Sequence, residues 1–432
     1  MARQMKDSGI EWIGDIPEDW GIARTKSFFT HHKHVAGETA EQYERLALTL
    51  NGVIRRPKDD STGLQPEAFN GYQILRQNEL VFKLIDLENV ATSRVGYSPY
   101  TGIVSPAYIV LDPREENESK FGEYFFLSMW QREIFNHMGD DGVRSSLNSG
   151  DLLNIPYPIA PADEKRRIVA FLDCKCAKID AVIERTKVTI EEYKKLKQAV
   201  ITEAVTKGVR GPRPMKDSGY DFIGTVPDEW EVCRLRSIGA PQNGISKGGE
   251  FFGQGFPFVS YGDVYKNFAL PTSVAGLVES TEDERERYSV QYGDIFFTRT
   301  SETIEEVGFS SVCLQTIPDA TFAGFLIRVR PYTDKLFAEY SKYYFRSSHH
   351  RAYLTKQMNL VTRASLGQDL LKSMPVLLPS IEEQKEIAAF LDEKCAALDT
   401  LIAKKTALLT ELETYKKSLI YEYVTGKKEV TA

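Results

Sequence analysis

The sequence lacks the motifs of a self-contained enzyme. It contains no GxxxxGK phosphate loop followed by Ser or Thr, no GxGxxG after an expected strand, and no HExxH pair of zinc ligands. The Asn-Pro-Pro-aromatic signature of adenine methyltransferases is also missing. These absences argue against an NTPase, a dinucleotide-dependent enzyme, a zinc protease and a methyltransferase.

Cysteine and histidine are sparse. The five cysteines include no pair at CxxC spacing, which argues against a disulfide framework and fits a reducing cytoplasm. Cys174 and Cys176 lie two positions apart on an expected helix, so they cannot chelate one ion together. The histidines form short runs without a carboxylate or cysteine partner and are typical of solvated loops. We expect no metal site at His31, His32, His34, His349 and His350.

Long hydrophobic runs are absent as well. No stretch approaches the roughly 18 apolar residues that cross a membrane, and the opening MARQMKDSGIEWIG has no apolar secretory region. We expect a cytoplasmic protein with no membrane partner. The formal net charge is −7, so any contact with nucleic acid would have to come from local basic patches on an acidic body.

The sequence contains an internal duplication. Residues 5–28 and 215–238 share eleven of 24 positions, at an offset of 210. Residues 164–180 and 383–399 share ten of 17 positions, at an offset of 219. In the first repeat, aromatic residues flank Pro17 and Pro227, and we interpret this pattern as a packing clip.

The second repeat opens two long helices, expected at about 163–207 and 380–426. Ser380 with Glu383 has capping-box spacing, and Asp163 can cap the first helix. Apolar residues recur every three or four positions, close to a heptad. Neither stripe has a partner in its own half, so the helices should pack antiparallel on each other. The alternative is that each helix lies on its own globular domain. The expected seam comprises Ile168, Leu172, Ile179, Ile183, Ile190, Tyr193, Val200, Ile387, Leu391, Leu398, Ile402, Leu409, Leu412 and Leu419.

Two diverged segments, 29–152 and 239–371, lie between the repeats. Short β-type runs alternate there with turn residues, for example at 72–75, 79–84, 108–111, 294–298 and 325–329. Each segment also has one expected helix, at Phe121–His137 and Lys335–Gln357. The predicted fold is α+β, with two globular domains joined by two long antiparallel helices that form a coiled coil with pseudo-two-fold symmetry.

The expected domains are residues 1–155, the central helix 156–208, residues 209–374 and the distal helix 375–432. Only the six residues 209–214 join the first helix to the second MKDSG sequence. Six residues reach at most about 21 Å. By symmetry the second helix should end near Met5, which predicts a circular organisation.

This pattern resembles the specificity subunit of type I restriction-modification systems over essentially the whole chain. The resemblance rests on IEWIGDIPEDW and YDFIGTVPDEW, on IPYPIAPADEKRRIVAFLD and MPVLLPSIEEQKEIAAFLD, and on the helix ends AVITEAVTKG and SLIYEYVTGK. One departure is that the first helix entry reads Asp163-Glu164-Lys165, where the second reads Glu383-Gln384-Lys385 and is closer to the usual Glu-Gln pattern.

The resemblance implies a non-catalytic DNA-recognition subunit. Each target-recognition domain would read one half of an asymmetric, bipartite double-stranded DNA target, and the helices would set the spacing. It implies that two modification subunits methylate adenine with S-adenosylmethionine and that restriction subunits translocate and cut DNA with ATP and Mg. It implies no cofactor in this chain. The alternatives are a self-contained methyltransferase or nuclease, and a coiled-coil adaptor without a DNA role.

Candidate DNA-binding residues are polar or basic side chains of the two diverged segments. Arg144 and Arg363 are the strongest candidates because they occupy equivalent places, although a salt bridge to the helices would explain them equally well. The set in the first segment is Lys33, His34, Arg55, Arg56, Lys58, Lys83, Arg94, Arg144, Ser145 and Asn148. The set in the second is Asn243, Lys247, Gln254, Tyr261, Lys266, Arg299, Thr300, Lys356, Asn359 and Arg363.

Overall fold

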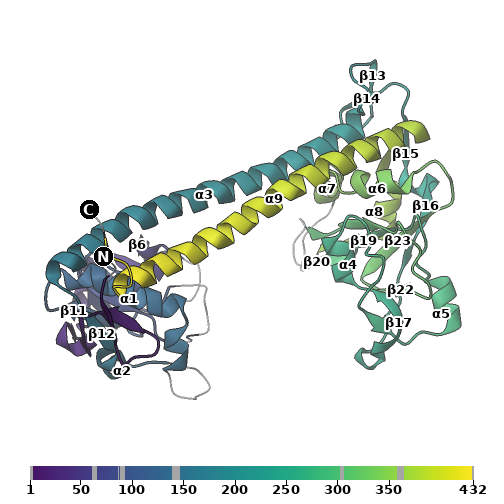
Figure 1. The fold of residues 1–432 in the computed structure, drawn as a ribbon. Helices are drawn as coiled ribbons and strands as arrows, with labels where there is room; N and C mark the ends of the chain where they lie inside the picture. Colours follow the sequence, from purple (N-terminus) through teal and green to yellow (C-terminus); the bar gives the residue numbers. More distant parts are fainter. Residues whose placement is uncertain are drawn as a thin grey trace. The chain divides into compact units, whose positions relative to one another are not determined.

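The computed structural model describes residues 3–60, 66–85, 87, 93–138, 146–301, 306–357 and 364–430. The chain divides into two compact units. Unit 1 comprises residues 1–187 and 407–432, and unit 2 comprises residues 188–406. Each unit holds a globular head and one segment of each long helix, α3 (Ala162–Lys207) and α9 (Ile381–Val424) (Figure 1). The predicted helix limits are confirmed to within two residues.

The head of unit 1 is built on two four-stranded sheets, ordered β6-β5-β10-β7 and β4-β11-β8-β9. Every pairing in them is antiparallel except that of β5 with β10. The strands of unit 1 are β1 (Met5–Asp7), β2 (Asp15–Pro17), β3 (Gly21–Arg24), β4 (Phe29–His31), β5 (Arg45–Thr49), β6 (Gly52–Arg56), β7 (Gln73–Leu75), β8 (Leu80–Phe82), β9 (Val95–Tyr97), β10 (Gly102–Val104), β11 (Ile109–Pro113) and β12 (Pro156–Ile159). Its other helices are η1 (Thr25–Ser27), η2 (Gly37–Gln42), α1 (Glu118–Gln131), η3 (Ile134–His137) and α2 (Ser149–Asn154).

The head of unit 2 repeats this plan, with sheets ordered β16-β23-β19-β21 and β18-β17-β22. Here too one pairing, β17 with β22, is parallel. The strands of unit 2 are β13 (Met215–Asp217), β14 (Thr225–Pro227), β15 (Glu231–Arg234), β16 (Gly239–Asn243), β17 (Phe252–Val259), β18 (Leu277–Val278), β19 (Ile295–Thr298), β20 (Thr300–Ser301), β21 (Ser310–Val312), β22 (Thr321–Phe322), β23 (Leu326–Pro331), β24 (Ala364–Ser365) and β25 (Pro375–Leu378). Its other helices are η4 (Leu235–Ser237), η5 (Gly249–Phe251), α4 (Tyr261–Lys266), α5 (Glu282–Arg287), α6 (Ala338–Tyr344), α7 (Ser348–Gln357) and α8 (Gln368–Ser373).

Strand order therefore makes the ribbon β5–β6 of unit 1 the counterpart of the ribbon β17–β18 of unit 2. Strands β8 and β19 correspond likewise. Every residue of these two strands is buried, which explains their unbroken runs of apolar and aromatic side chains. The predicted α+β class and all five predicted strand regions are confirmed.

Both predicted head helices are broken in the structure. The first ends at Gln131, and Glu133 then adopts a positive φ of 60° before η3 begins. The second divides into α6 and α7. Helix α3 binds the chain at this break, because Gln198 donates to the Arg346 carbonyl and Thr202 Oγ1 accepts from the Ser348 amide. These bonds satisfy helix-end groups that would otherwise need a continuous helix.

The two long helices run antiparallel in each unit. In unit 1, Lys416 Nζ lies 2.6 Å from Asp180 Oδ1, and in unit 2, Lys197 Nζ lies 2.6 Å from Asp399 Oδ2. The residue numbers of both pairs add to 596, which is the signature of a single antiparallel register. The offset of 219 also converts one pair into the other. The two ion pairs are therefore equivalent contacts of one duplicated helix pair.

Residues of the expected seam are buried between these helices to different degrees. In unit 1, Ile168, Leu172, Ile179 and Ile183 share a hydrophobic cluster with Leu419, Leu409 and Leu412. In unit 2, Ile387 and Leu391 share a cluster with Val200. Ile190 is buried, whereas Tyr193, Leu398 and Ile402 are half-buried. The seam also uses residues outside the expected set, which are Cys176, Ile201, Val205, Ala388, Cys395, Ile420 and Val424.

Each packing clip is fastened to a helix start. In unit 1 the buried Trp20 donates from Nε1 to Glu164 Oε2 over 2.9 Å, and Arg3 binds the same carboxylate. In unit 2, Trp230 Nε1 donates to Glu383 Oε2 over 3.1 Å, and Arg213 is its cationic partner. Both carboxylates lie in the first turn of their helices, where negative charge is favoured. The Trp ring and the Arg together fix that turn against the clip.

The N-terminal repeat and the end of α9 meet within unit 1 (Figure 1). The Tyr421 hydroxyl donates to the Ile13 carbonyl over 2.9 Å, and Lys427 Nζ donates to the Asp15 carbonyl over 2.7 Å. A Cβ on Gly426 would lie 2.5 Å from Pro17 Cδ, so the end of α9 touches the clip of residues 5–28. The predicted closeness of the second helix end to the N-terminal repeat is confirmed.

Three local expectations are wrong. His349 and His350 are buried on α7 instead of lying in a solvated loop, and burial lowers the pKa of His349 to about 3. Asp163 lies inside the first turn of α3 and does not cap it, because the helix already begins at Ala162. Residues 156–159 and 375–378 form strands, so both helices begin several residues after the expected boundaries at 156 and 375.

Candidate nucleic-acid interface

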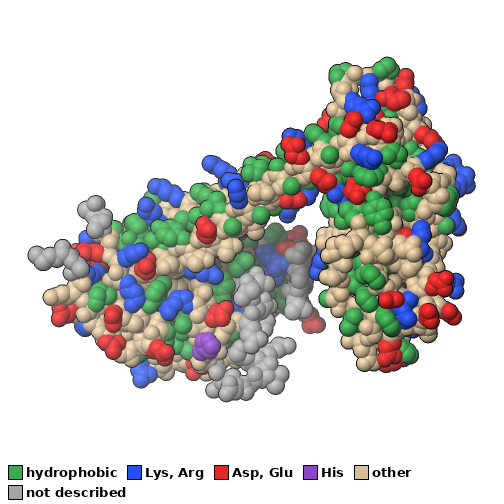
Figure 2. Space-filling model, turned by 45° about the vertical axis from the view of Figure 1, so that its right-hand side comes forward, with side chains coloured by type: hydrophobic (Ala, Val, Ile, Leu, Met, Phe, Trp, Pro, Cys, Tyr) green, Lys and Arg blue, Asp and Glu red, His purple; other side chains and the backbone are tan. Residues whose placement is uncertain are grey.

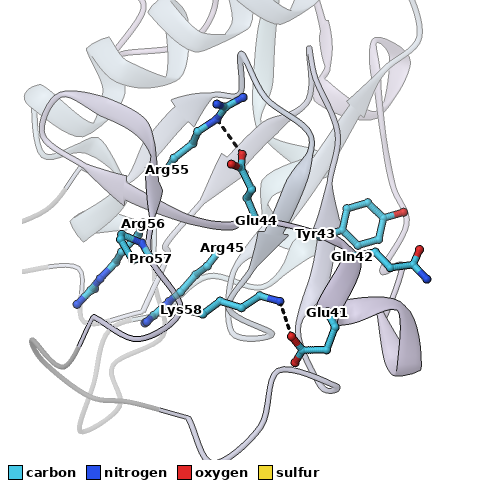
Figure 3. Close-up of a pocket in the computed structure, with 9 residues that line it drawn as sticks. All are labelled: Glu41, Gln42, Tyr43, Glu44, Arg45, Arg55, Arg56, Pro57 and Lys58. Atoms are coloured by element: carbon cyan, nitrogen blue, oxygen red, sulfur yellow. Dashed lines mark hydrogen bonds and ion pairs between the residues drawn. The ribbon is translucent and has the colours of Figure 1, made fainter.

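A basic pocket opens beside the ribbon β5–β6 of unit 1. Its volume is about 680 Å³, and it is lined by Glu41, Gln42, Tyr43, Glu44, Arg45, Arg55, Arg56, Pro57 and Lys58. Figure 3 shows Arg45, Arg56 and Lys58 gathered on one side, whereas Tyr43 and Gln42 point to the other. Four cations face two carboxylates here. Three of the four cations were expected from the sequence, and the structure brings them together.

Two cations of this pocket pair with exposed carboxylates, and a third, Arg56, forms a half-buried pair with Asp60 at 2.8 Å. Arg55 Nε lies 2.9 Å from Glu44 Oε2, and Lys58 Nζ lies 3.0 Å from Glu41 Oε2. The Arg55 guanidinium also lies 4.5 Å from the Tyr100 ring centroid. Exposed pairs of this kind contribute about 0–1 kcal/mol. A phosphate can therefore replace either carboxylate at little cost, while the aromatic ring keeps the guanidinium oriented.

Arg45 was missed by the sequence-based reasoning. It begins β5 and is only 6% exposed, with its guanidinium 5.6 Å from the Phe69 ring. Arg45 lies between Glu44 and Leu46, and nothing in this local sequence marks it as a pocket residue. Arg45 pairs directly with Arg56 across the ribbon. A correct alignment of the two strands would therefore have placed Arg45 beside an expected DNA-binding residue.

The other expected residues of unit 1 are scattered. Lys33 and His34 are exposed, and Lys33 donates to the Pro106 carbonyl. Arg94 is fully buried, which does not fit a residue that touches DNA. The Asn148 side chain caps α2 by accepting from the amides of Gly150 and Asp151. The cap explains this residue without a DNA contact.

One arrangement is common to both heads. In unit 1 the segment after β8 meets residues 146–147, since Ile85 bridges Ser146 and the Leu147 amide donates to the Leu84 carbonyl. In unit 2 the segment after β19 forms β20 and pairs with β24. In unit 2 this pairing brings Arg299 and Thr300 next to residues 364–366. In unit 1 the corresponding contact brings Lys83 near residue 146. The strongest candidates, Arg144 and Arg363, lie outside the described residues, as do Ser145 and Asn359.

The remaining candidates of unit 2 have varied surroundings. Lys266 and Lys356 are exposed. Asn243 accepts a hydrogen bond from Gln368 over 3.1 Å. Tyr261 stacks on Tyr265 at the start of α4, with ring centroids 5.9 Å apart.

Arg346 holds the end of α4 in place. Its Nη2 donates to the carbonyls of Val264, Tyr265 and Asn267, and its Nε donates to the Ser310 carbonyl. Burial lowers the pKa of this guanidinium to about 10, so it stays charged at neutral pH. Arg346 thereby positions the helix that carries Tyr261 and Lys266.

Lys247 and Gln254 are engaged by carboxylates. Lys247 Nζ lies 2.7 Å from Glu284 Oε2 and lowers the pKa of that carboxyl. Gln254 donates to Glu279 over 2.5 Å. These contacts argue against both residues as DNA-binding residues, because the neighbouring carboxylates of Glu284 and Glu279 would repel a phosphate. On the face drawn in Figure 2, basic and acidic side chains alternate over each unit without forming a continuous basic stripe.

The structure offers little support for a hydrolase. Residues 244–248 read Gly-Ile-Ser-Lys-Gly, which fits GxSxG spacing, but Ser246 lies in a loop followed only by the three-residue η5. A nucleophile elbow requires a sharp turn from a strand directly into a helix. In the described residues no helix is long and apolar enough to cross a membrane.

Comparison with known proteins gives a consistent assignment. Residues 227–413 match the family model of the type I restriction modification DNA specificity domain. The type I restriction enzyme EcoKI specificity subunit from Escherichia coli is 26% identical, over 97% of this chain and 91% of its own length. The MjaVIII specificity subunit from Methanocaldococcus jannaschii is 23% identical, over 96% and 94%.

Solved structures share the fold. One described as the structural basis of complex assembly and conformational transition of the type I R-M system has a TM-score of 0.71 at 17% identity. It covers 96% of this chain and 99% of the other. The HsdS subunit from Thermoanaerobacter tengcongensis has a TM-score of 0.50 at 16% identity, covering 96% and 98%.

Proposed function

We propose that this chain is a specificity subunit of a type I restriction-modification system and that each of its units reads one half of a split DNA target. The observation that carries the proposal is the contrast between frame and heads. Clip and helix contacts recur pair by pair at fixed offsets, whereas the head segments 29–152 and 239–371 carry different side chains. Two different reading surfaces on a repeated frame suit an asymmetric target with two unlike halves.

Methylation mapping tests this directly. The chain would be co-expressed with the modification subunit encoded beside it, and methylated adenines would be located across a genome. We expect one bipartite motif with two different half-sites. Exchanging the head segment 29–152 for that of a relative should replace one half-site and leave the other unchanged. A single continuous motif, or two changed half-sites, would contradict the proposal.

We further propose that the helices dock two modification subunits. Large apolar side chains are exposed at equivalent positions of the duplicated helices. Val182 (46% exposed) and Tyr415 (53%) lie at one level of the helix pair in unit 1, and Leu401 (42%) and Leu196 (49%) occupy the corresponding level in unit 2. The offset of 219 relates Val182 to Leu401 and Leu196 to Tyr415. Equivalent exposed patches support two copies of the same partner.

Stoichiometry distinguishes the two patches. With Tyr415→Ser in the chain, we expect one modification subunit to bind where the unaltered chain binds two, as measured by native mass spectrometry. Leu196→Ser should do the same through the other patch. Leu50→Ser, which alters an exposed apolar residue on the β5–β6 turn, is the control and should keep two. Retention of two subunits by both helix variants would exclude this surface.

The cofactors belong to the partners in this proposal. The modification subunits would use S-adenosylmethionine, and the restriction subunits would use ATP and Mg. In this proposal the chain is cytoplasmic, and its own contribution is DNA recognition only. Calorimetric titration of S-adenosylmethionine into the isolated chain should give no binding heat. Saturable binding would favour the self-contained methyltransferase instead.

A further inference from the structure

The ribbon β17–β18 of unit 2 ends in an exposed aromatic tip. Phe251, Phe252 and Phe256 are 37%, 40% and 36% exposed, and Leu277 on the paired strand is 36% exposed. Isolated exposed apolar residues are ordinary, but a contiguous group on one ribbon marks an interaction site. We call these four residues the aromatic tip.

The backbone of the ribbon is shaped to present this tip. Phe252 and Phe256 both pair with Val278, so the three residues between them bulge out of the strand. Gly253 and Gly255 in the bulge have φ of +95°, a conformation that other residues rarely adopt. A Cβ on Gly255 would also meet the Val278 carbonyl at 2.6 Å. The bulge is therefore a defined feature that places two phenylalanines on the same stretch of the ribbon.

The two cations beneath the tip, Arg285 and Lys247, are already paired with carboxylates. The Arg285 guanidinium lies 3.7 Å from the Phe256 ring centroid and pairs with Asp319 at 3.6 Å. Lys247 lies 5.4 Å from the Phe251 ring and pairs with Glu284. Both charged side chains are less than 20% exposed, at 18% for Arg285 and 16% for Lys247. They orient the rings and offer little positive charge to the outside.

Acidic side chains dominate the outside. Residues 247–257 and 277–287 contain three cations and six carboxylates. Glu250, Glu279, Glu282, Asp283 and Glu286 are all exposed. The equivalent stretch 41–60 of unit 1 has four cations and four carboxylates, so its charges balance. A phosphate backbone would be repelled by the ribbon of unit 2 and not by the ribbon of unit 1.

We propose that the aromatic tip of unit 2 is a docking site for a protein partner whose contact surface is basic around an apolar depression. The phenylalanines would fill the depression, and the surrounding carboxylates would pair with its lysines and arginines. Charge complementarity selects this partner over DNA. This inference rests on the proposed function only in supplying the proteins to test, which are the modification and restriction subunits encoded with the chain.

Site-specific photo-crosslinking tests the proposal on the assembled complex. Benzoylphenylalanine would replace Phe252 in the full chain, and the complex with modification subunits, restriction subunits and a target duplex would be irradiated. We expect a crosslink to one of the protein subunits. The same probe at Tyr332, an aromatic residue of unit 2 that is 61% exposed, is the matched control and should give none. A crosslink from position 252 to DNA, or none in an assembled complex, would overturn the proposal.

Affinity measurements provide an independent test. Phe252→Ser and Phe256→Ser should each weaken the crosslinked subunit's binding by roughly tenfold, the loss typical of an interface aromatic. Glu282→Gln with Glu286→Gln preserves the folded surface, and it should weaken that binding and flatten its salt dependence. Target methylation by the chain with modification subunits reports the proposed function separately. If the charge variant binds the subunit unchanged, the docking proposal fails even where methylation is intact.

Discussion

At the scale of single residues, the helix starts differ between the two units in one buried contact. Lys165 is 3% exposed and binds Glu118, which also accepts from the Tyr157 hydroxyl. The equivalent Gln384 instead accepts from the Phe337 amide and donates to the Lys335 and Pro379 carbonyls. The departure from the usual Glu-Gln pair is thus compensated within the head of unit 1. Lys165 faces inward and offers no surface to a partner subunit.

Lys165→Gln should destabilise unit 1 by about 3–5 kcal/mol, because it leaves the Glu118 carboxylate buried without a cation. Adding Glu118→Phe imports the arrangement of unit 2 and should recover most of that loss. Urea unfolding of the full chain at neutral pH measures both variants. If the double variant is less stable than the single variant, the Glu118 carboxylate itself stabilises the fold through its hydrogen bond from Tyr157.

Residue-scale DNA contact is most testable at Arg55. Arg55→Gln should weaken binding to target and non-target duplexes alike, and it should reduce the slope of log affinity against log salt by about 0.9, as expected for one lost phosphate contact. Fluorescence anisotropy of the complex with modification subunits over a salt series measures this. Lys394→Gln on α9, at a side chain that is 49% exposed, is the control. An unchanged slope for Arg55→Gln would remove the basic pocket from the interface.

At the scale of elements, periodicity predicted the long helices well because a heptad pattern over forty residues leaves few alternatives. The same reasoning missed the break after Gln131, where Glu133 adopts a positive φ, and the break after Tyr344, which α3 binds through Gln198 and Thr202. It also overestimated Arg94, because burial is a property of the folded sheet. No code links side chains in loops to the bases that they read, so the sequence predicted many DNA-binding residues. Of these, the fold brings Arg55, Arg56 and Lys58 together in one pocket.

The shared register makes the helix pair a testable ruler. Residues 186–192 of α3 and 404–410 of α9 lie opposite each other in the register that adds to 596. Removing both heptads preserves the seam and shortens each helix by about 10.5 Å, close to three base pairs at about 3.4 Å each.

Methylation mapping of this variant should show both half-sites unchanged and the gap between them shorter by about three base pairs. Removing residues 186–192 alone breaks the register and should abolish target methylation, which makes it the matched control. If the doubly shortened chain methylates with the original gap, the helices do not set the spacing.

At the scale of the whole molecule, the chain closes on itself in the same way at both helix ends. The end of α3 runs through Gly208–Pro214, seven residues, into the strand at Met215. Beyond α9 lie the eight residues Thr425–Ala432, and four residues precede Met5. Twelve residues would thus replace seven if the termini were joined, so no added linker is needed.

A permutant opened between Gly211 and Pro212, with Ala432 joined to Met1, should fold and direct methylation to the original target. The pairs Arg210–Glu386 and Arg213–Glu383 lie on either side of the opening and remain intact. Mapping the methylated sites checks the outcome, and circular dichroism checks the fold. A folded permutant without methylation would mean that the chain order contributes more than connectivity.

The register of Asp180 with Lys416 and of Lys197 with Asp399 has a consequence for inheritance. Each helix pair takes one partner from each copy of an ancient duplication, so a change in one copy is felt by the other, hundreds of codons away. An insertion that lengthens one helix is harmful until a matching insertion arises in its twin. The heads carry no such obligation, because each completes its sheets within its own unit. Recombination can therefore exchange heads freely, whereas the length of the helices can drift only in concert.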